Sequence, residues 1–297
     1  MKKYIKAVLF IIAYTLIYMS IMLLCQFIFG IFIGGAGKDL PELFSQSHTV
    51  AQEQLEEAAL SLTEKINDYV IKNSGIIFSI SALLSLLIFI QIFKARKLNI
   101  FSEIGIDRRP AGFDLRYGLF AGASANFLIS VIVMSIQSAG LFRDAFSEYD
   151  SHIEMTFGTG GVLPTLLGLG IVVPIIEEIM FRGIITFELN RIAPWKAAII
   201  IQGAIFGLYH LVPVQISYTV PLGIYFGYIA YKSSSIWPAA AAHIAMNTVA
   251  IVLSTPAAAS VLGQPAFSMI FAIISVYMFI SSMMYFIKKK PSNIVSE

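Results

Sequence analysis

The stretch GIIFSISALLSLLIFIQIF, residues 75–93, contains no charged residue and decides the fold class of this chain. A helix needs about 20 consecutive apolar residues to cross the hydrocarbon core of a bilayer. Similar blocks recur along the sequence, so that 57% of its 297 residues are hydrophobic and 13% are charged. A soluble domain carries about 25% charged residues. The sequence therefore predicts a membrane protein.

The apolar blocks number about eight by this length criterion. Lipid offers no water to backbone N–H and C=O groups, so a spanning segment must be a helix or part of a closed barrel. The blocks lack the two-residue alternation of barrel strands. We therefore expect an all-α, polytopic transmembrane helix bundle that forms a single membrane domain, 1–297. The predicted spans lie near 4–33, 75–93, 117–138, 161–181, 197–213, 214–231, 236–255 and 265–287.

Lysine and arginine concentrate in alternate connections between the blocks. The segment 94–116 holds six basic residues. Further basic residues lie near the two termini and in 191–196. The connection 139–160 holds one basic residue against four acids, and 256–264 holds none. Because cytoplasmic loops carry the excess of Lys and Arg, we expect both termini in the cytoplasm. The predicted localisation is an integral membrane protein, in the plasma membrane if the source is bacterial.

The long connection 36–74 has three lysines against seven acids, a net charge of −4. Apolar residues recur in it at helical spacing, which predicts an amphipathic extracytoplasmic helix lying against the outer membrane face. A lid or a docking surface for a partner is the alternative. His48 and His152 fall in outer connections, where we expect them to be solvated. The single cysteine, Cys25, has no disulfide partner and is expected to serve packing.

Ionisable side chains inside spans are costly and are functional suspects by default. The first group is PIIEEIMFR, residues 174–182, expected near the cytoplasmic end of the fourth span. Glu178 and Arg182 are four residues apart, so they share a helix face and can pair. Glu177 is rotated by about 100° from Glu178 and lacks that arginine, which suits it to exchange protons. The alternative is that both acids only extend their carboxylates to the interface between membrane and water and have no functional role.

Two further groups lie on later spans. His210 follows Phe206 by one turn, and Gly203 and Gly207 form a small-xxx-small pair that lets a neighbouring helix approach closely. On the seventh span His243 and Asn247 are four residues apart and face the same way. Either histidine taken alone is explained equally well by a hydrogen bond between helices.

Taken together, the three groups resemble the CAAX prenyl protease and bacteriocin-processing family of intramembrane proteases, also called the Abi or type II CAAX protease-like family. The resemblance covers 160–255, the predicted catalytic core, and is absent from the first three spans. Its motifs, in family order, read Glu177-Glu178-x-x-x-Arg182, Phe206-x-x-x-His210 and His243-x-x-x-Asn247.

The resemblance implies an endopeptidase that hydrolyses a peptide bond inside the membrane. It implies that Glu177 and His210 activate water and that His243 and Asn247 stabilise the oxyanion. It also implies that Glu178, Arg182 and Phe206 support the site. Such chemistry needs a base working near neutral pH and donors where negative charge develops.

Two histidines and a glutamate are also ligand types that hold zinc with a fourth position free for water, and the family has been called metalloprotease on that ground. Zinc ligands would here be Glu177, His210 and His243. We favour water activation by the side chains, without an obligatory metal. The predicted partners are the lipid bilayer and a peptide or membrane-protein substrate, with no nucleic acid.

Two other functions remain open from the sequence. A non-catalytic scaffold or immunity protein of the same fold would keep the polar residues as helix contacts. A proton-coupled transporter also uses buried Glu and His, but the spans show no inverted repeat or pair of broken helices.

Overall fold

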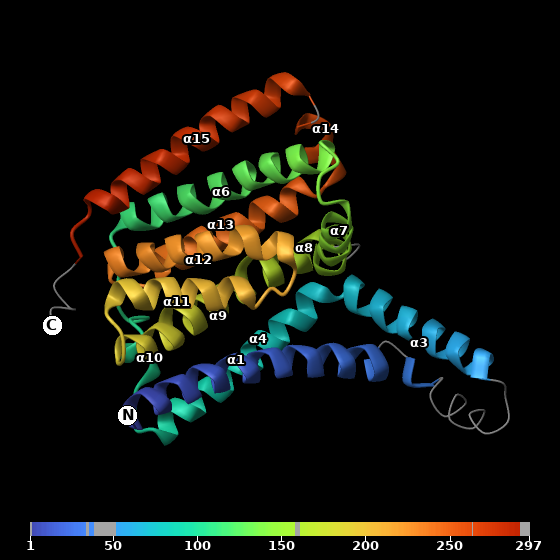
Figure 1. Ribbon diagram of the computed structural model, residues 1–297, viewed down its shortest axis with the longest axis horizontal. Coiled ribbons are helices and arrows are strands. Elements are labelled where there is room, and N and C mark those ends of the chain that lie inside the picture. Colours follow the sequence, from blue (N-terminus) through green and yellow to red (C-terminus); the bar gives the residue numbers. More distant parts are fainter. Residues whose placement is uncertain (1, 34–35, 39–51, 158–160, 263, 292–297) are drawn as a thin grey trace.

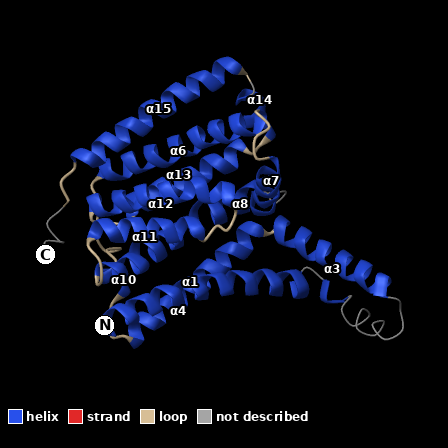
Figure 2. Cartoon of the chain, in the orientation of Figure 1, coloured by secondary structure: helices blue, strands red, loops and turns tan. Residues whose placement is uncertain are grey.

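The computed structural model describes residues 2–33, 36–38, 52–157, 161–262 and 264–291, and the regular structure of these residues is helical throughout (Figure 2). The all-α prediction is therefore confirmed. The elements are α1 (Lys2–Ile28), η1 (Phe29–Ile33), η2 (Ala36–Lys38), α3 (Gln52–Lys72), α4 (Ser74–Ala95), α5 (Ile100–Glu103), α6 (Gly112–Ser138), α7 (Arg143–Phe157), α8 (Val162–Thr165), η3 (Leu166–Val172), α9 (Val173–Glu178), η4 (Ile179–Ile185), α10 (Thr186–Asn190), α11 (Trp195–Leu208), α12 (Pro213–Ser233), α13 (Trp237–Leu253), α14 (Pro256–Leu262) and α15 (Pro265–Lys288).

The long helices lie roughly side by side, with α15 and α6 along one side of the bundle and α1 and α4 along the other (Figure 1). The start of α1 and the end of α15 lie at the same end of the bundle, while α7 and α14 lie at the opposite end (Figure 1). Buried apolar residues form two clusters, one where α1 and α4 meet α9, α10 and α11, and one among α6, α12, α13 and α15. The segments that resemble the protease family contribute residues to both clusters.

The number of spans differs from the expected eight. Within the described residues, five helical stretches are long and apolar enough to cross a membrane, or six if the bent pair α13 and α14 counts as one span. The 14 residues of α11 reach about 21 Å at 1.5 Å per residue, short of a hydrocarbon core of about 30 Å. In α12 a proline and several tyrosines lower the apolar content. The prediction of eight spans is thus not confirmed, although a helical membrane bundle is.

One continuous helical stretch runs from Val162 to Asn190 and contains two π-helical segments, η3 and η4. Such segments are rare and often mark functional sites. The short α9 lies between these two segments, and the two adjacent acids, Glu177 and Glu178, are its last residues. The acid motif therefore lies near the middle of this 29-residue stretch. The predicted end of the fourth span at residue 181 was too early, because the helix continues to Asn190.

Glycines allow the helices that carry the site to touch backbone to backbone. A Cβ added to Gly122 of α6 would lie 1.7 Å from the carbonyl oxygen of Ala242 on α13. On α11, a Cβ at Gly207 would lie 2.2 Å from Cγ2 of Val220, and one at Gly203 would lie 2.6 Å from the backbone nitrogen of Ile224, both on α12. The predicted close approach of a helix to the glycine pair is confirmed.

The expected amphipathic helix within 36–74 is present as α3, while residues 39–51 lie outside the described part of the chain. Its side chains Leu55, Leu62, Ile66 and Tyr69 are partly buried, and a Cβ on Gly30 of η1 would lie 2.6 Å from Cγ2 of Ile66. The apolar face of α3 therefore packs on the end of the first span. Cys25 is buried, as expected for a packing residue.

Candidate active site

The carboxylate of Glu178 is fully buried and binds two cationic or polar side chains through one oxygen. Its Oε1 accepts a hydrogen bond from Nη1 of Arg182 at 2.7 Å, which confirms the predicted pairing at a spacing of four residues. The same oxygen lies 2.9 Å from Nδ1 of His243. Because a carboxylate accepts and does not donate, Nδ1 of His243 carries the hydrogen. This contact fixes the tautomer of the ring and was not predicted from the sequence.

Arg182 is held from several sides. Its Nη2 donates to the carbonyl oxygen of Gly223 at 3.3 Å, and its guanidinium lies 4.3 Å from the centre of the Phe206 ring. An arginine stacked on an aromatic face gains a cation–π attraction, which replaces part of the interaction with water that it loses on burial. The arginine therefore ties α9 and η4 to α11 and α12.

Glu177 lies on the other edge of the same imidazole. Its Oε2 is 3.7 Å from Nε2 of His243, and its Oε1 accepts a hydrogen bond from the hydroxyl of Tyr18 at 3.4 Å. Tyr18 comes from α1 and is fully buried. Two acids about 100° apart on one helix thus flank a single histidine ring from α13.

Sequence reasoning missed Tyr18, because α1 carries none of the motifs. A signal was present: Tyr14 and Tyr18 place two hydroxyl groups four residues apart inside the first apolar block. Hydroxyls at such positions need partners within the protein. Tyr18 finds Glu177, and Tyr14 accepts a hydrogen bond from Arg96 at 3.0 Å.

His210 lies just beyond the end of α11, where its Nδ1 is 2.9 Å from the carbonyl oxygen of Phe206. Both imidazoles pack edge-to-face on Phe206, with ring centres 5.1 Å away for His210 and 5.6 Å away for His243. Among the described residues, the hydrogen-bond and ion-pair contacts of Glu177 are with Tyr18 and His243. The structure thus brings His210 close to His243 and not into contact with Glu177.

Asn247 lies one turn beyond His243 on α13, as its spacing predicts. Its Nδ2 donates to the carbonyl oxygen of Leu169 in η3 at 2.9 Å. That oxygen lies in a π-helical segment, where some carbonyls lack their usual helical partner. The amide therefore joins α13 to the helix that carries the acids.

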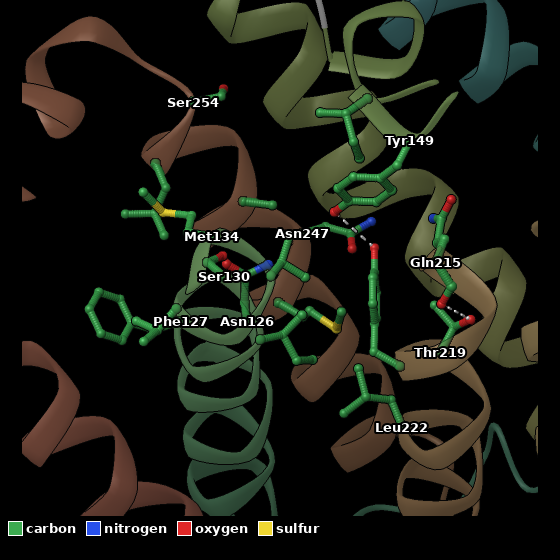
Figure 3. A pocket seen from close by; sticks show the side chains of 18 of the residues that line it. Asn126, Phe127, Ser130, Met134, Tyr149, Gln215, Thr219, Leu222, Asn247 and Ser254 are labelled. Atoms are coloured by element: carbon green, nitrogen blue, oxygen red, sulfur yellow. Dashed lines mark hydrogen bonds between the residues drawn. The ribbon is translucent and has the colours of Figure 1, made fainter. Parts of the chain in front are cut away.

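A cavity of about 750 Å³ adjoins these groups, and His210, His243 and Asn247 all line it. Figure 3 shows Asn126, Ser130 and Met134 of α6 on one side of it, with Tyr149, Gln215 and Thr219 on the other. Glu177 and Glu178 do not line the cavity. Both contact His243, which does line it. The site therefore presents two imidazoles and an amide to a large cavity and holds the two acids behind them.

The set Glu177, His210 and His243 does not fit a zinc site in this arrangement. Within the described residues no group of three or more His, Cys, Asp or Glu side chains is placed to hold a metal ion. Both nitrogens of His243 already face carboxylates.

The sequence has two other histidines, His48 and His152, and neither belongs to the three motifs. His48 lies outside the described residues. His152, expected to be solvated, is half-buried on α7, and that burial lowers the pKa of its imidazole against the opposing effect of Glu148. Its helix, α7, lies at one end of the bundle (Figure 1).

The family described as type II CAAX prenyl endopeptidase, Rce1-like, matches residues 159–249. No curated protein and no solved structure gives a significant match. The matched range contains all three polar motifs and overlaps the predicted core 160–255. Residues 159–249 of this chain are thus similar to the Rce1-like family of type II CAAX prenyl endopeptidases.

Proposed function

We propose that this chain is an intramembrane endopeptidase that hydrolyses a peptide bond of a membrane-associated protein or peptide. The observation that carries the proposal is the juxtaposition of His210, His243 and Asn247 on one cavity, with two carboxylates behind His243. The match to an endopeptidase family over the same residues supports it.

Hydrolysis requires a water molecule to lose a proton while its oxygen attacks the scissile carbonyl carbon. The carbonyl oxygen then becomes an oxyanion, and the C–N bond breaks as the nitrogen takes up a proton. A base must therefore accept the proton and later return it to the leaving amine. Donors aimed at the oxyanion lower the barrier most in a site that excludes bulk water.

The family resemblance assigns water activation to Glu177 and His210, and oxyanion stabilisation to His243 and Asn247. The contacts favour a different division of labour, in which Glu177 and His243 act on the water. With Nδ1–H of His243 directed at Glu178, its Nε2 keeps a lone pair that faces Glu177 Oε2 across 3.7 Å. One water can hydrogen-bond to both atoms, and the amide of Asn247 then remains as a donor on the cavity wall. His210 also lines the wall, but its Nδ1–H is taken by the Phe206 carbonyl oxygen, so that Nε2 of the neutral ring is an acceptor.

The supporting roles of Glu178, Arg182 and Phe206 follow from their contacts. Glu178 fixes the tautomer of His243, Arg182 compensates the buried charge of Glu178, and Phe206 separates the two imidazoles. None of the three meets the cavity as an acid or base. We expect their replacement to misplace the histidines.

The test is comparative proteomics of membranes from cells that make the wild-type chain or its Glu177→Gln variant at equal level. The amide keeps the size of the side chain and removes its ability to take a proton. We expect uncut precursor to accumulate, with the rate of processing lower by roughly 10²–10⁴-fold. The matched control is Glu57→Gln, the same change at an exposed position of α3.

Processing that continues unchanged in the Glu177→Gln variant would contradict an endopeptidase. If the biological effect of the protein also survived unchanged, the non-catalytic scaffold or immunity function would be the better description.

A further inference from the structure

The cavity belongs to one end of the helix bundle. Most of its lining residues come from the second half of α6, from α12 and from α13 beyond His243, and others come from α7, the end of α11, α14 and the start of α15. His243 marks its inner limit on α13, and Ser254 lies on its wall at the other end of that helix. The cavity thus runs from the candidate active site toward α7 and α14. Figure 1 shows these two helices at one end of the bundle.

The basic residues gather at the opposite end of the bundle. The start of α1, the α4–α6 connection, the α10–α11 connection, the end of α12 and the end of α15 all meet there (Figure 1). Their basic residues are Lys2, Lys3, Lys6, Arg96, Lys97, Arg108, Arg109, Arg191, Lys196, Lys232, Lys288, Lys289 and Lys290. At the cavity end, α7 carries one arginine against four acids, and α14 carries no charge.

Basic residues close to the ends of spans stay in the cytoplasm. The asymmetry therefore places the basic end inside the cell and the cavity end outside. We propose that the cavity opens on the non-cytoplasmic face of the membrane, so that the peptide to be cut enters from that side. This inference rests on the proposed function and adds the side of the membrane from which the substrate enters.

A second, smaller cavity of about 190 Å³ lies at the basic end and includes Arg182, Arg108 and Trp195 in its lining. It is the competing route to the site. It does not include His210, His243 or Asn247, so a peptide bound there would not meet the groups that are needed for hydrolysis. The larger cavity is the one that joins the catalytic side chains to a membrane face.

The lining of the larger cavity indicates the kind of segment that it accepts. Among the described residues that line it, Asp150 is the one Asp, Glu, Lys or Arg, and it lies on α7. The rest of the lining mixes apolar side chains such as Leu222 and Met246 with uncharged amides such as Asn126 and Gln215. A charged side chain would lose its water there without gaining a partner. The fitting substrate is therefore an uncharged, largely apolar peptide segment.

The amides also offer hydrogen bonds to a peptide backbone. Within the described residues, Oδ1 of Asn126 and Oε1 of Gln215 have no hydrogen-bond partner. An unmade bond at a buried amide costs about 1–3 kcal/mol, so N–H groups of a bound segment would stabilise both side chains. A segment of a membrane protein just below its non-cytoplasmic end meets these requirements, since such segments are apolar and leave the lipid on that side.

The lone cysteine makes the side of the opening measurable. Cys25 is first replaced by serine, and one new cysteine is introduced by Ser130→Cys at the cavity wall. Two exposed positions serve as references: Ser147→Cys on α7 at the cavity end, and Ser102→Cys on α5 at the basic end. Each variant is treated with a membrane-impermeant maleimide, in intact spheroplasts and in inside-out vesicles.

We expect the Ser130→Cys and Ser147→Cys variants to be labelled in spheroplasts, and Ser102→Cys to be labelled in inside-out vesicles. Labelling of Ser130→Cys from the same side as Ser102→Cys would overturn the proposal, as would failure to label it from either side. Labelling of Ser102→Cys in intact spheroplasts would invert the topology and overturn it too.

The same labelling is repeated in the Glu177→Gln background. Because maleimide labelling needs no catalysis, its pattern reports the opening even if the chain proves not to be a peptidase. Precursor accumulation reports catalysis even if the opening faces the cytoplasm. The two proposals can therefore fail separately.

Discussion

His243 is the residue on which the contacts of the site converge. Glu178 holds one of its nitrogens at 2.9 Å, Glu177 faces the other at 3.7 Å, and Phe206 packs against its ring. A side chain fixed from three sides loses little further freedom when it reacts, which is a main source of enzymatic rate. Its partners differ in one respect: Glu178 is bound to Arg182, whereas Glu177 forms no ion pair with a Lys or Arg among the described residues.

The division of labour at the site can be read from paired substitutions. If Glu177 and His243 act on one water, each of Glu177→Gln and His243→Gln lowers the cleavage rate by roughly 10²–10⁴-fold, and the double variant is no slower than the worse single one. Groups that act as a unit give such non-additive effects. The measurement is the processing rate of the substrate found by proteomics.

The matched comparison is the same set of single and double variants with His210→Gln in place of His243→Gln. If water activation belongs to Glu177 and His210, that pair is non-additive, and the effects of Glu177→Gln and His243→Gln multiply instead. The two assignments thus predict opposite patterns from the same five variants, three single and two double.

Residue spacing alone predicted part of this site. The pairing of Glu178 with Arg182 and the shared direction of His243 and Asn247 follow from helix geometry within one segment. The contacts of His243 with both acids join residues 65 positions apart or more and depend on how α13 packs against α9. No local pattern encodes that packing, and the same is true of Tyr18 on the first span.

At the scale of the elements, close packing of α6 on α13 holds His243 in place, since Ala242 precedes it directly. Replacement of Gly122 by alanine adds a methyl group 1.7 Å from the Ala242 carbonyl oxygen, so one helix must move. We expect a loss of about 1–3 kcal/mol in the free energy of unfolding, measured by thermal unfolding in detergent, together with lower activity.

The control for this substitution lies on the same helix. A Cβ added to Gly112, in the first turn of α6, meets nothing within 4 Å. Gly112→Ala should leave stability and activity close to those of the wild type. Equal stability of the Gly122→Ala and Gly112→Ala variants would show that α6 and α13 do not need this contact.

Element boundaries were predicted less well than element type. Hydropathy identified the apolar blocks, and the first three long helices fall on the predicted spans at 4–33, 75–93 and 117–138. It placed the end of the fourth span too early, because Glu177, Glu178 and Arg182 interrupt an apolar run that in fact continues to Asn190. A window average cannot distinguish a charge at the membrane edge from one buried by neighbouring helices.

For the whole molecule, the charge asymmetry predicts where the chain ends lie. We expect a reporter fused after Glu297 to be active if it requires the cytoplasm and inactive if it requires the opposite compartment. The reciprocal fusion within α7 should give the opposite result. A cytoplasmic signal from the α7 fusion would contradict the predicted topology of the whole bundle.

The two π-helical segments on either side of α9 set a strict limit on how this protein can vary. Connections between helices accept added or lost residues, because a loop can be re-routed around them. Removing one residue between Leu166 and Val172 would instead turn every following side chain of the helix by about 100°, swinging both acids away from the imidazole between them. Relatives that keep the chemistry should differ freely in loop length and yet agree, to the residue, on the length of this stretch.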